Sequence, residues 1–203
     1  MTISNERRER AFREASTWPQ FLDSMKVNRA AIETNYAGCR LDEATKARLA
    51  RLPGVTDVLV LAHDWCGDVV ANLPLFAKIE VQTGKIRLHI LPKDPDNVDI
   101  GLLYPHADGD VHIPIYLFFD EEGRGKGHFI ERTEEMTELL GTWIIDFWNA
   151  RPDLEGKGMP FSALAPDVRI SLLSQLATER GKVRDREREG IVAMLEGLLA
   201  AEV

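Results

Sequence analysis

The chain has 203 residues, 44% of them apolar and 29% charged, which suits one well-buried core with extensions better than two full domains. Its net charge of -8 argues against nucleic-acid binding, because a phosphate backbone requires a concentrated excess of Lys and Arg. Its two cysteines, Cys39 and Cys66, are too few for a disulfide framework and lack the companions of a zinc site, so any cysteine function is expected to be that of a thiol.

The N-terminal sequence MTISNERRERAFREA carries charges where a secretory signal needs an apolar core. Elsewhere the chain has no run of about 18 apolar residues of the kind that spans a membrane. We therefore expect a soluble, cytoplasmic protein that has neither a membrane nor a nucleic acid as its partner.

Residues 4–36 have the pattern of helices with an approximate apolar stripe. Ser4 is a candidate cap for the first helix, and Thr17, followed by a tryptophan and an early proline, is a candidate cap for the next. A shorter helix is expected over residues 42–52, before a Pro-Gly pair. These elements predict a helical N-terminal extension over residues 1–54 that packs on the core.

The pattern changes at residues 57–63, where DVLVLAH has no helical stripe and is typical of a strand buried on both faces of a sheet. Residues 67–84 have helical spacing interrupted by Pro74, and residues 85–91 again predict a strand. Strand, helix and strand in this order indicate a βαβ unit whose two strands lie parallel.

Two further apolar runs, residues 113–120 and 127–132, flank a turn that contains glycine and predict an antiparallel hairpin. A helix is expected over residues 133–150 with Thr133 as its candidate cap. A full capping box would have Glu or Gln where Met136 stands, so this start signal is incomplete. The second half of the predicted domain is therefore ββα.

Residues 151–166 contain several prolines and glycines and predict a boundary loop, followed by one or two helices with a charge-rich middle. The mixed-sign tract ERGKVRDRERE is a possible docking segment, although we expect a solvated helix face. The terminal IVAMLEGLLAA is expected to cover the core, with dimerisation as the alternative. We thus predict a sheet domain at residues 55–150 and a C-terminal linker and helical extension at 151–203.

Three features at separate positions resemble the thioredoxin superfamily. The first strand ends in Trp65, Cys66 and Gly67, as it does in the thioredoxin active-site motif. Thioredoxins kink their first core helix at the position of Pro74. They place a cis-proline loop that faces the cysteine at the position of Ile113-Pro114. The helical lead-in and the motif DWCGD are similar to an uncharacterised bacterial thioredoxin-like family. The resemblance implies an α/β thioredoxin-like fold, with a mixed central sheet built from βαβ and then ββα and with helical extensions at both ends.

The sequence departs from thioredoxin at two positions. The dithiol motif continues Pro-Cys after the glycine, whereas this chain has Asp68 and Val69. Val69 cannot supply the second sulfur that resolves a mixed disulfide, so an outside thiol would have to do so. The aspartate that thioredoxins bury six residues before the cysteine is here Val60. Both departures remove the same half of the dithiol cycle.

The sequence leaves the acidity of Cys66 open. The start of a helix favours the thiolate, because free N–H groups and the positive end of the dipole lie there. Asp64 and Asp68 act in the opposite direction, since a carboxylate within about 6 Å disfavours the anion. Asp68 also has a structural explanation, because an acidic residue stabilises the first turn of a helix.

The resemblance implies one leading function and one alternative to it. In the first, Cys66 is a single nucleophilic thiol that exchanges with protein or low-molecular-weight disulfides, and Trp65, Gly67, Asp68, Ile113 and Pro114 form the substrate groove. In the second, the chain is a non-catalytic module that binds a peptide or protein in the same groove. Pro114 is alternatively an ordinary strand-initiating proline, and Trp65 alternatively covers the edge of the fold itself.

Neither a metal nor another cofactor is expected. His63 and His112 are candidates for flanking the thiol, but two histidines with one nearby cysteine do not form a credible metal set. Cys39 follows a glycine that ends a helix and is expected to be a small packed residue. A bridge between Cys39 and Cys66 would require their α-carbons to lie within about 7 Å of each other.

Overall fold

A computed structural model describes residues 2–200 of the chain. Residues 2–132 together with 192–200 form one compact unit, and residues 133–191 form a second. The predicted terminal segment IVAMLEGLLAA ends at Ala201, which lies outside the described residues. Within the described part of the chain, no helix combines the length and the apolar character needed to cross a bilayer.

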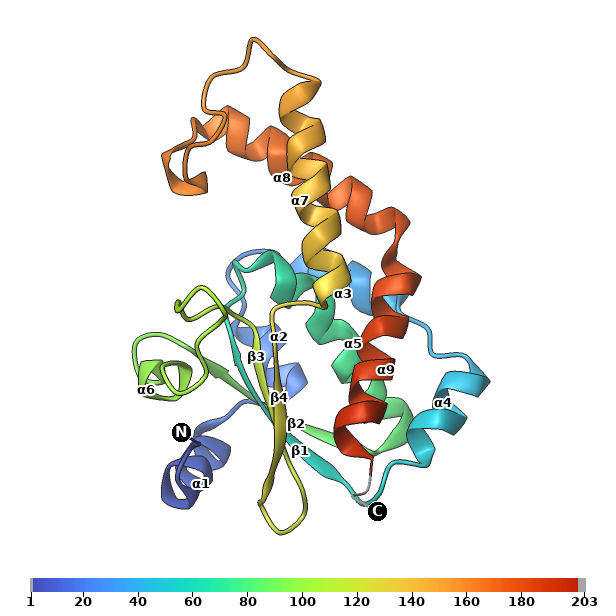
Figure 1. Ribbon diagram of the computed structural model, residues 1–203. Helices are drawn as coiled ribbons and strands as arrows, with labels where there is room; N and C mark the ends of the chain where they lie inside the picture. The colour runs from blue at the N-terminus through green and yellow to red at the C-terminus, as the bar shows by residue number, and fades with distance from the viewer. Residues whose placement is uncertain (1, 201–203) are drawn as a thin grey trace. The chain divides into compact units, whose positions relative to one another are not determined.

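The first unit is built on a four-stranded mixed sheet (Figure 1) with the strand order β2-β1-β3-β4. Its strands are β1 (Thr56–Ala62), β2 (Ile86–Pro92), β3 (Ile115–Phe119) and β4 (Gly125–Ile130). β1 pairs parallel with β2, whereas β3 pairs antiparallel with both β1 and β4. The helix α5 (Gly67–Thr83) connects β1 to β2, so the predicted βαβ unit and hairpin are both present, and the thioredoxin-like fold class is confirmed.

Within residues 2–132, four helices precede the βαβ unit in the chain, and a short one follows it. Before the sheet come α1 (Asn5–Glu14), α2 (Trp18–Ser24), α3 (Arg29–Gly38) and α4 (Glu43–Ala50), and after β2 comes the short α6 (Val98–Gly101). The predicted cap at Ser4 is confirmed, because its side chain accepts from the backbone N–H of Arg7 at 3.2 Å. Thr17 forms a capping box with Gln20. These caps divide the lead-in into separate short helices.

β1 is buried on both faces because successive side chains of a strand alternate between two cores. Leu59 belongs to a core cluster that includes Ala11 of α1 and Ile100 of α6. Tyr116 of β3 meets the ring of Phe76 from α5, with the ring centroids 4.1 Å apart. The continuous apolar run in the sequence therefore reflects a central strand covered from both sides.

The second unit is helical. It contains α7 (Glu134–Asn149), the 3-10 helix η1 (Phe161–Ala163), α8 (Pro166–Lys182) and the first part of α9 (Arg184–Leu199). Thr133 caps α7 as predicted, because its side chain accepts a hydrogen bond from the backbone N–H of Met136 at 3.4 Å. No Glu or Gln follows at the position that would complete a capping box. A small core cluster centres on Phe147, Trp148 and Leu164.

The charge-rich tract is solvated only in part: Lys182, Asp185, Arg186 and Glu189 are exposed as expected, whereas Arg180 and Glu187 are buried. The side chain of Glu187 is only 1% exposed, and its carboxylate contacts Arg180 Nε at 3.1 Å and Arg184 Nη1 at 2.8 Å. The chain leaves helical geometry at Val183, between α8 and α9, which lets the two helix ends share one buried ion-pair network. Where two helices meet in this way, basic and acidic side chains can form buried ion pairs with one another and need not face water.

Candidate functional site

Cys66 occupies the N-cap position of α5, directly after β1 and a short turn. Its carbonyl accepts the first helical hydrogen bond, from the backbone N–H of Val70 at 3.1 Å. The residue is 9% exposed, and its sulfur is a free thiol. The strand-to-helix junction that the sequence predicts therefore places the sulfur at a helix start, but mostly shielded from water.

The structure brings Cys66 together with the segment that precedes β3. The Cys66 thiol donates to the carbonyl oxygen of Ile113 across 3.3 Å, although the two residues are 47 positions apart. The Ile113–Pro114 peptide bond is cis. Ile115 follows directly and pairs with Leu61 of β1, so the sheet register brings the end of β1 alongside the start of β3.

Burial raises the pKa of the Cys66 thiol, and the negative charges of Asp68 and Glu131 add to this effect. The backbone N–H groups of Val69 and Asp68 act in the opposite direction, as expected for a helix start. Burial and the two carboxylates outweigh them, so the structure resolves the sign that the sequence left open. The resting state of this sulfur at neutral pH is the thiol.

Asp68 is one end of a chain of ion pairs beside the thiol. Its carboxylate receives Arg132 Nε at 3.1 Å and Arg132 Nη2 at 2.8 Å. Nη1 of the same guanidinium lies 3.2 Å from Glu131 Oε2, and Glu131 Oε1 lies 3.1 Å from His112 Nδ1. The sequence pointed to Asp68 and His112, but it contained no local signal for the two residues that connect them.

Glu131 has the left-handed backbone conformation, with φ of 55°, which is uncommon for a residue with a side chain. Its N–H donates to the carbonyl of Pro114 at 2.8 Å, and its own carbonyl accepts from Asn72 Nδ2 at 3.0 Å. These bonds hold the end of β4 against both α5 and the Ile113–Pro114 segment. The backbone therefore places the Glu131 and Arg132 side chains next to Cys66.

Trp65 is 60% exposed. Its ring stacks on that of His63 with the centroids 5.3 Å apart. Asp64 accepts the backbone N–H groups of Lys26 and Val27 at 2.7 and 3.1 Å, so it anchors the lead-in. Burial acts to raise the pKa of Asp64, but these bonds outweigh it and hold the pKa below its ordinary value.

Gly67 is the first residue of α5, next to the thiol, and nothing lies within 4 Å of the position that a β-carbon would take there. Cys39 is buried at the C-terminal end of α3, in agreement with the packed residue expected from the sequence. Like Cys66, it carries a reduced thiol.

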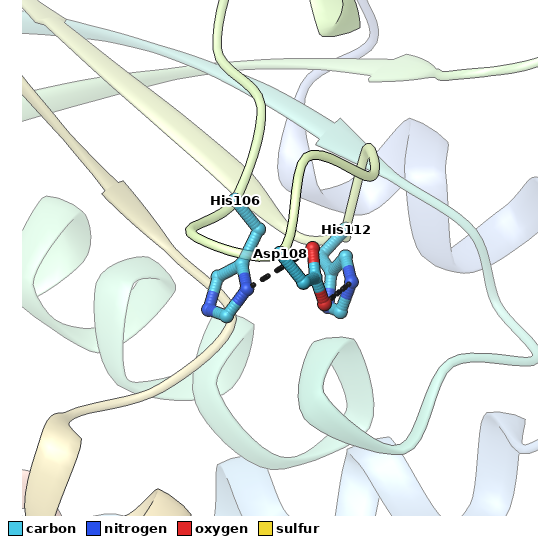
Figure 2. Close-up of side chains that lie close together, drawn as sticks. All are labelled: His106, Asp108 and His112. Atoms are coloured by element: carbon cyan, nitrogen blue, oxygen red, sulfur yellow. Dashed lines mark ion pairs between the residues drawn. The ribbon is translucent and has the colours of Figure 1, made fainter.

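A second group of side chains lies on the loop that leads into Ile113. His106, Asp108 and His112 place one imidazole nitrogen or carboxylate oxygen each within 4.8 Å of one another (Figure 2). His112 was considered with His63 at the sequence level, yet the structure pairs His63 with Asp94 instead, at 3.3 Å. The spacing of the cluster, H-x-D-x₃-H, is the signal that sequence reasoning missed.

Comparisons with known proteins identify the family of this chain and two solved structures with a similar fold. The model of a family described as Thioredoxin matches residues 15–147. A crystal structure of a protein of unknown function from Pseudomonas aeruginosa is 20% identical, with a TM-score of 0.57 over 89% of this chain and 99% of that one. An HIV epitope scaffold is also 20% identical, with a TM-score of 0.58 over 85% of this chain and 97% of that one.

A search of curated proteins finds no significant match. At 20% identity, the two solved structures establish a shared fold and nothing about activity. The family match, in contrast, spans well over half of the sequence and includes Cys66, Ile113 and Pro114. The chain therefore belongs to the thioredoxin family.

Proposed function

We propose that the chain is a thioredoxin-fold binding protein that holds an extended peptide or protein partner beside Cys66, with Cys66 as a resting thiol. The observation that carries this proposal is the 3.3 Å contact between the thiol and the carbonyl of Ile113. A thiolate has no proton to donate to that oxygen, and it is the thiolate that attacks disulfides. The site thus favours the form of sulfur that does not react.

The surroundings of the sulfur support the same proposal. Desolvation and the charges of Asp68 and Glu131 all favour the neutral thiol. Val69, fully buried one turn along α5, offers no second sulfur to release a trapped partner. Two buried cysteines that both carry reduced thiols also fit a reducing compartment such as the cytoplasm, which we propose as the location of the protein.

Trp65 is the anchor we propose for the partner. Its exposed ring lies one residue before the thiol, and large exposed aromatic side chains are frequent centres of binding energy. Gly67 would line the same groove and the buried Pro114 would support it, while Ile113 would offer its backbone N–H to an extended chain because its carbonyl already accepts from Cys66. Such a groove binds through main-chain contacts and so accepts a class of partner sequences.

Slow exchange by a monothiol route is the second candidate function, because Cys66 lies at a helix N-cap where two backbone N–H groups stabilise its anion. In this route the Cys66 thiolate attacks a partner disulfide, forms a mixed disulfide and releases one partner thiolate. An outside thiolate then attacks the mixed disulfide, takes the partner sulfur and restores the Cys66 thiolate. The second step depends entirely on that outside thiol.

Alkylation of Cys66 with iodoacetamide, followed by peptide mass spectrometry between pH 5.5 and 10.5, decides between the two functions. We expect a midpoint above about 8.5, the value of a free thiol. Cys39, which is buried at the end of α3, is expected to stay unmodified in the same digest. A midpoint below about 8.5 would replace the binding proposal with monothiol exchange.

A further inference from the structure

The loop between α6 and β3 gathers three metal-ligating side chains on the surface of the first unit. Asp108 lies between the two histidines, with Oδ2 2.9 Å from His112 Nε2 and Oδ1 3.5 Å from His106 Nδ1 (Figure 2). The two imidazole rings stack with their centroids 4.4 Å apart. All three residues come from one segment of the chain and leave the thiol at Cys66 unused.

We propose that His106, Asp108 and His112 bind a zinc-class divalent cation. Two imidazole nitrogens and one carboxylate oxygen are ligands that suit Zn²⁺ and its first-row neighbours, in contrast to the all-oxygen sets of Mg²⁺ and Ca²⁺. Three protein ligands leave the fourth tetrahedral position for water. Its three ligands are distinct from the residues of the proposed partner groove, although Glu131 lies beside both His112 and Cys66.

The second nitrogen of His112 provides an independent argument for the site. Nδ1 lies 3.1 Å from Glu131 Oε1, on the side away from Asp108, and the Glu131 side chain is itself mostly buried. A carboxylate that receives one ring N–H fixes the tautomer and leaves the other nitrogen free to ligate, which is the usual support of a metal-bound histidine. Glu131 is therefore a positioning residue for His112 and not a ligand.

His106 contributes the second nitrogen. Its Nδ1 is shielded from solvent and has no hydrogen-bond partner within residues 2–200, and the nearest carboxylate oxygen of Asp108 stands 3.5 Å away. A buried polar atom without a partner is costly, and a cation between these two residues would satisfy it.

The distances agree with a site that closes slightly on binding. Neighbouring ligand atoms around a tetrahedral Zn²⁺ are separated by about 3.3 Å. The three ligand atoms here lie within 4.8 Å of one another. Because the two imidazole rings stack at 20° to each other, they must rotate about their side-chain torsions before both nitrogen lone pairs point at one ion. The loop backbone needs no rearrangement, because His106 N–H donates to the Asp110 carbonyl at 2.8 Å and Gly109 N–H donates to the His106 carbonyl at 2.9 Å.

The test is a calorimetric titration of Zn²⁺ into the full-length chain, previously dialysed against a chelator. Asp108→Asn and Asp110→Asn are the matched pair, because each removes one negative charge from the same loop and only Asp108 is a proposed ligand. We expect the wild type to bind one Zn²⁺ per chain. Asp108→Asn and His112→Gln should each lower the Zn²⁺ affinity about 10-fold or more, whereas Asp110→Asn should keep the affinity within about twofold of the wild type.

Two further variants complete the test. Glu131→Gln is expected to weaken Zn²⁺ binding without abolishing it, and Cys66→Ser is expected to leave the affinity unchanged. The visible spectrum of a Co²⁺-loaded sample provides a readout of coordination that does not depend on activity or stability. The proposal is overturned if wild type shows no stoichiometric binding, if both Asp→Asn variants weaken it equally, or if Cys66→Ser abolishes it.

Discussion

The state of a single sulfur decides how the site of this protein works. A helix N-cap would by itself make Cys66 more acidic, and that effect is worth well under 2 kcal/mol at an exposed position. Burial of the thiol and two neighbouring carboxylates act in the opposite direction and dominate the pKa of Cys66. The side chain therefore keeps its proton, even though its position in the fold is the one where thioredoxin-like proteins carry a nucleophile.

Replacing Asp68 with Asn should make Cys66 more reactive. The substitution removes a carboxylate that disfavours the thiolate and leaves more of the positive charge of Arg132 uncompensated. We expect the alkylation midpoint of Cys66 to fall by about one pH unit. Asp96→Asn, at an exposed position of the same unit, is the control and should leave the midpoint where it is.

An unchanged midpoint in Asp68→Asn would mean that burial alone sets the pKa of Cys66. In that case the chain of ion pairs from Asp68 to His112 would have only a structural role.

At the scale of elements, the lead-in is bound to the sheet and to the helices α5 and α6 by several independent contacts. Ser16 exchanges two backbone hydrogen bonds with Ile90 of β2, at 2.8 and 2.9 Å. Arg7 of α1 forms a bidentate pair with Asp99 of α6, at 2.7 and 2.9 Å. Asn35 of α3 donates to a carbonyl of α5 at 2.9 Å. The lead-in therefore contributes to the core beneath α5.

Truncating Ile32 of α3 tests whether this contribution is energetic. The side chain is completely buried, and α3 packs against α5. We expect Ile32→Ala to lower the free energy of unfolding by about 2–5 kcal/mol, because it removes apolar contacts and leaves a cavity. Urea titration followed by circular dichroism measures the change.

Val27→Ala is the matched control, since Val27 belongs to the same lead-in but is 47% exposed. Its effect on the free energy of unfolding should stay within about 0.5 kcal/mol. Equal effects of the two truncations would show that the lead-in is an appendage that does not stabilise the sheet.

At the scale of the whole molecule, the chain forms two compact units that are held together internally by different means. The first unit has a sheet with a core on each face. The second is entirely helical, with a small aromatic and aliphatic cluster and a buried ion-pair network around Glu187. Burial lowers the pKa of Arg184, and the nearby carboxylate of Glu187 opposes this shift, so the network depends on that one acid.

Glu187→Gln should therefore destabilise the junction of α8 and α9. The substitution leaves two guanidinium groups close together without the carboxylate they share, and breaking a buried ion pair typically costs about 3–5 kcal/mol. Amide hydrogen exchange of α8 and α9 measures the local loss of protection.

Glu179→Gln is the comparison, because Glu179 pairs with Lys182 on the exposed surface of α8. The Glu179→Gln substitution should lower the free energy of unfolding by less than about 1 kcal/mol. If exchange is equally slow in Glu187→Gln and in wild type, the buried network does not stabilise the junction.

The elements of this protein were predictable because their signals are local. Ser4 and Thr133 cap helices at the positions the sequence indicated, and Gly84 ends α5 with a φ of 63°. The order of strands and helices, together with the Trp-Cys-Gly motif and two prolines, was enough for the fold class. Each of these signals depends on residues within one or two helical turns of one another.

The site was predictable only in part. That Cys66 lies at the start of a helix follows from the local sequence, whereas its protonation depends on a carbonyl 47 residues away and on Glu131. The buried Arg180–Glu187 pair is an exception to the solvated face expected for the charge-rich tract, and local sequence did not reveal it because burial depends on packing in space.

The sequence by itself thus determined the elements, the fold class and the place of the single thiol. Only the tertiary structure decided which charges surround that thiol and which side chains form the cluster on the loop before Ile113. The physical reason is range: hydrogen-bonded caps and apolar periodicity act between neighbours in the chain, while pKa values and ligand geometry depend on neighbours in space.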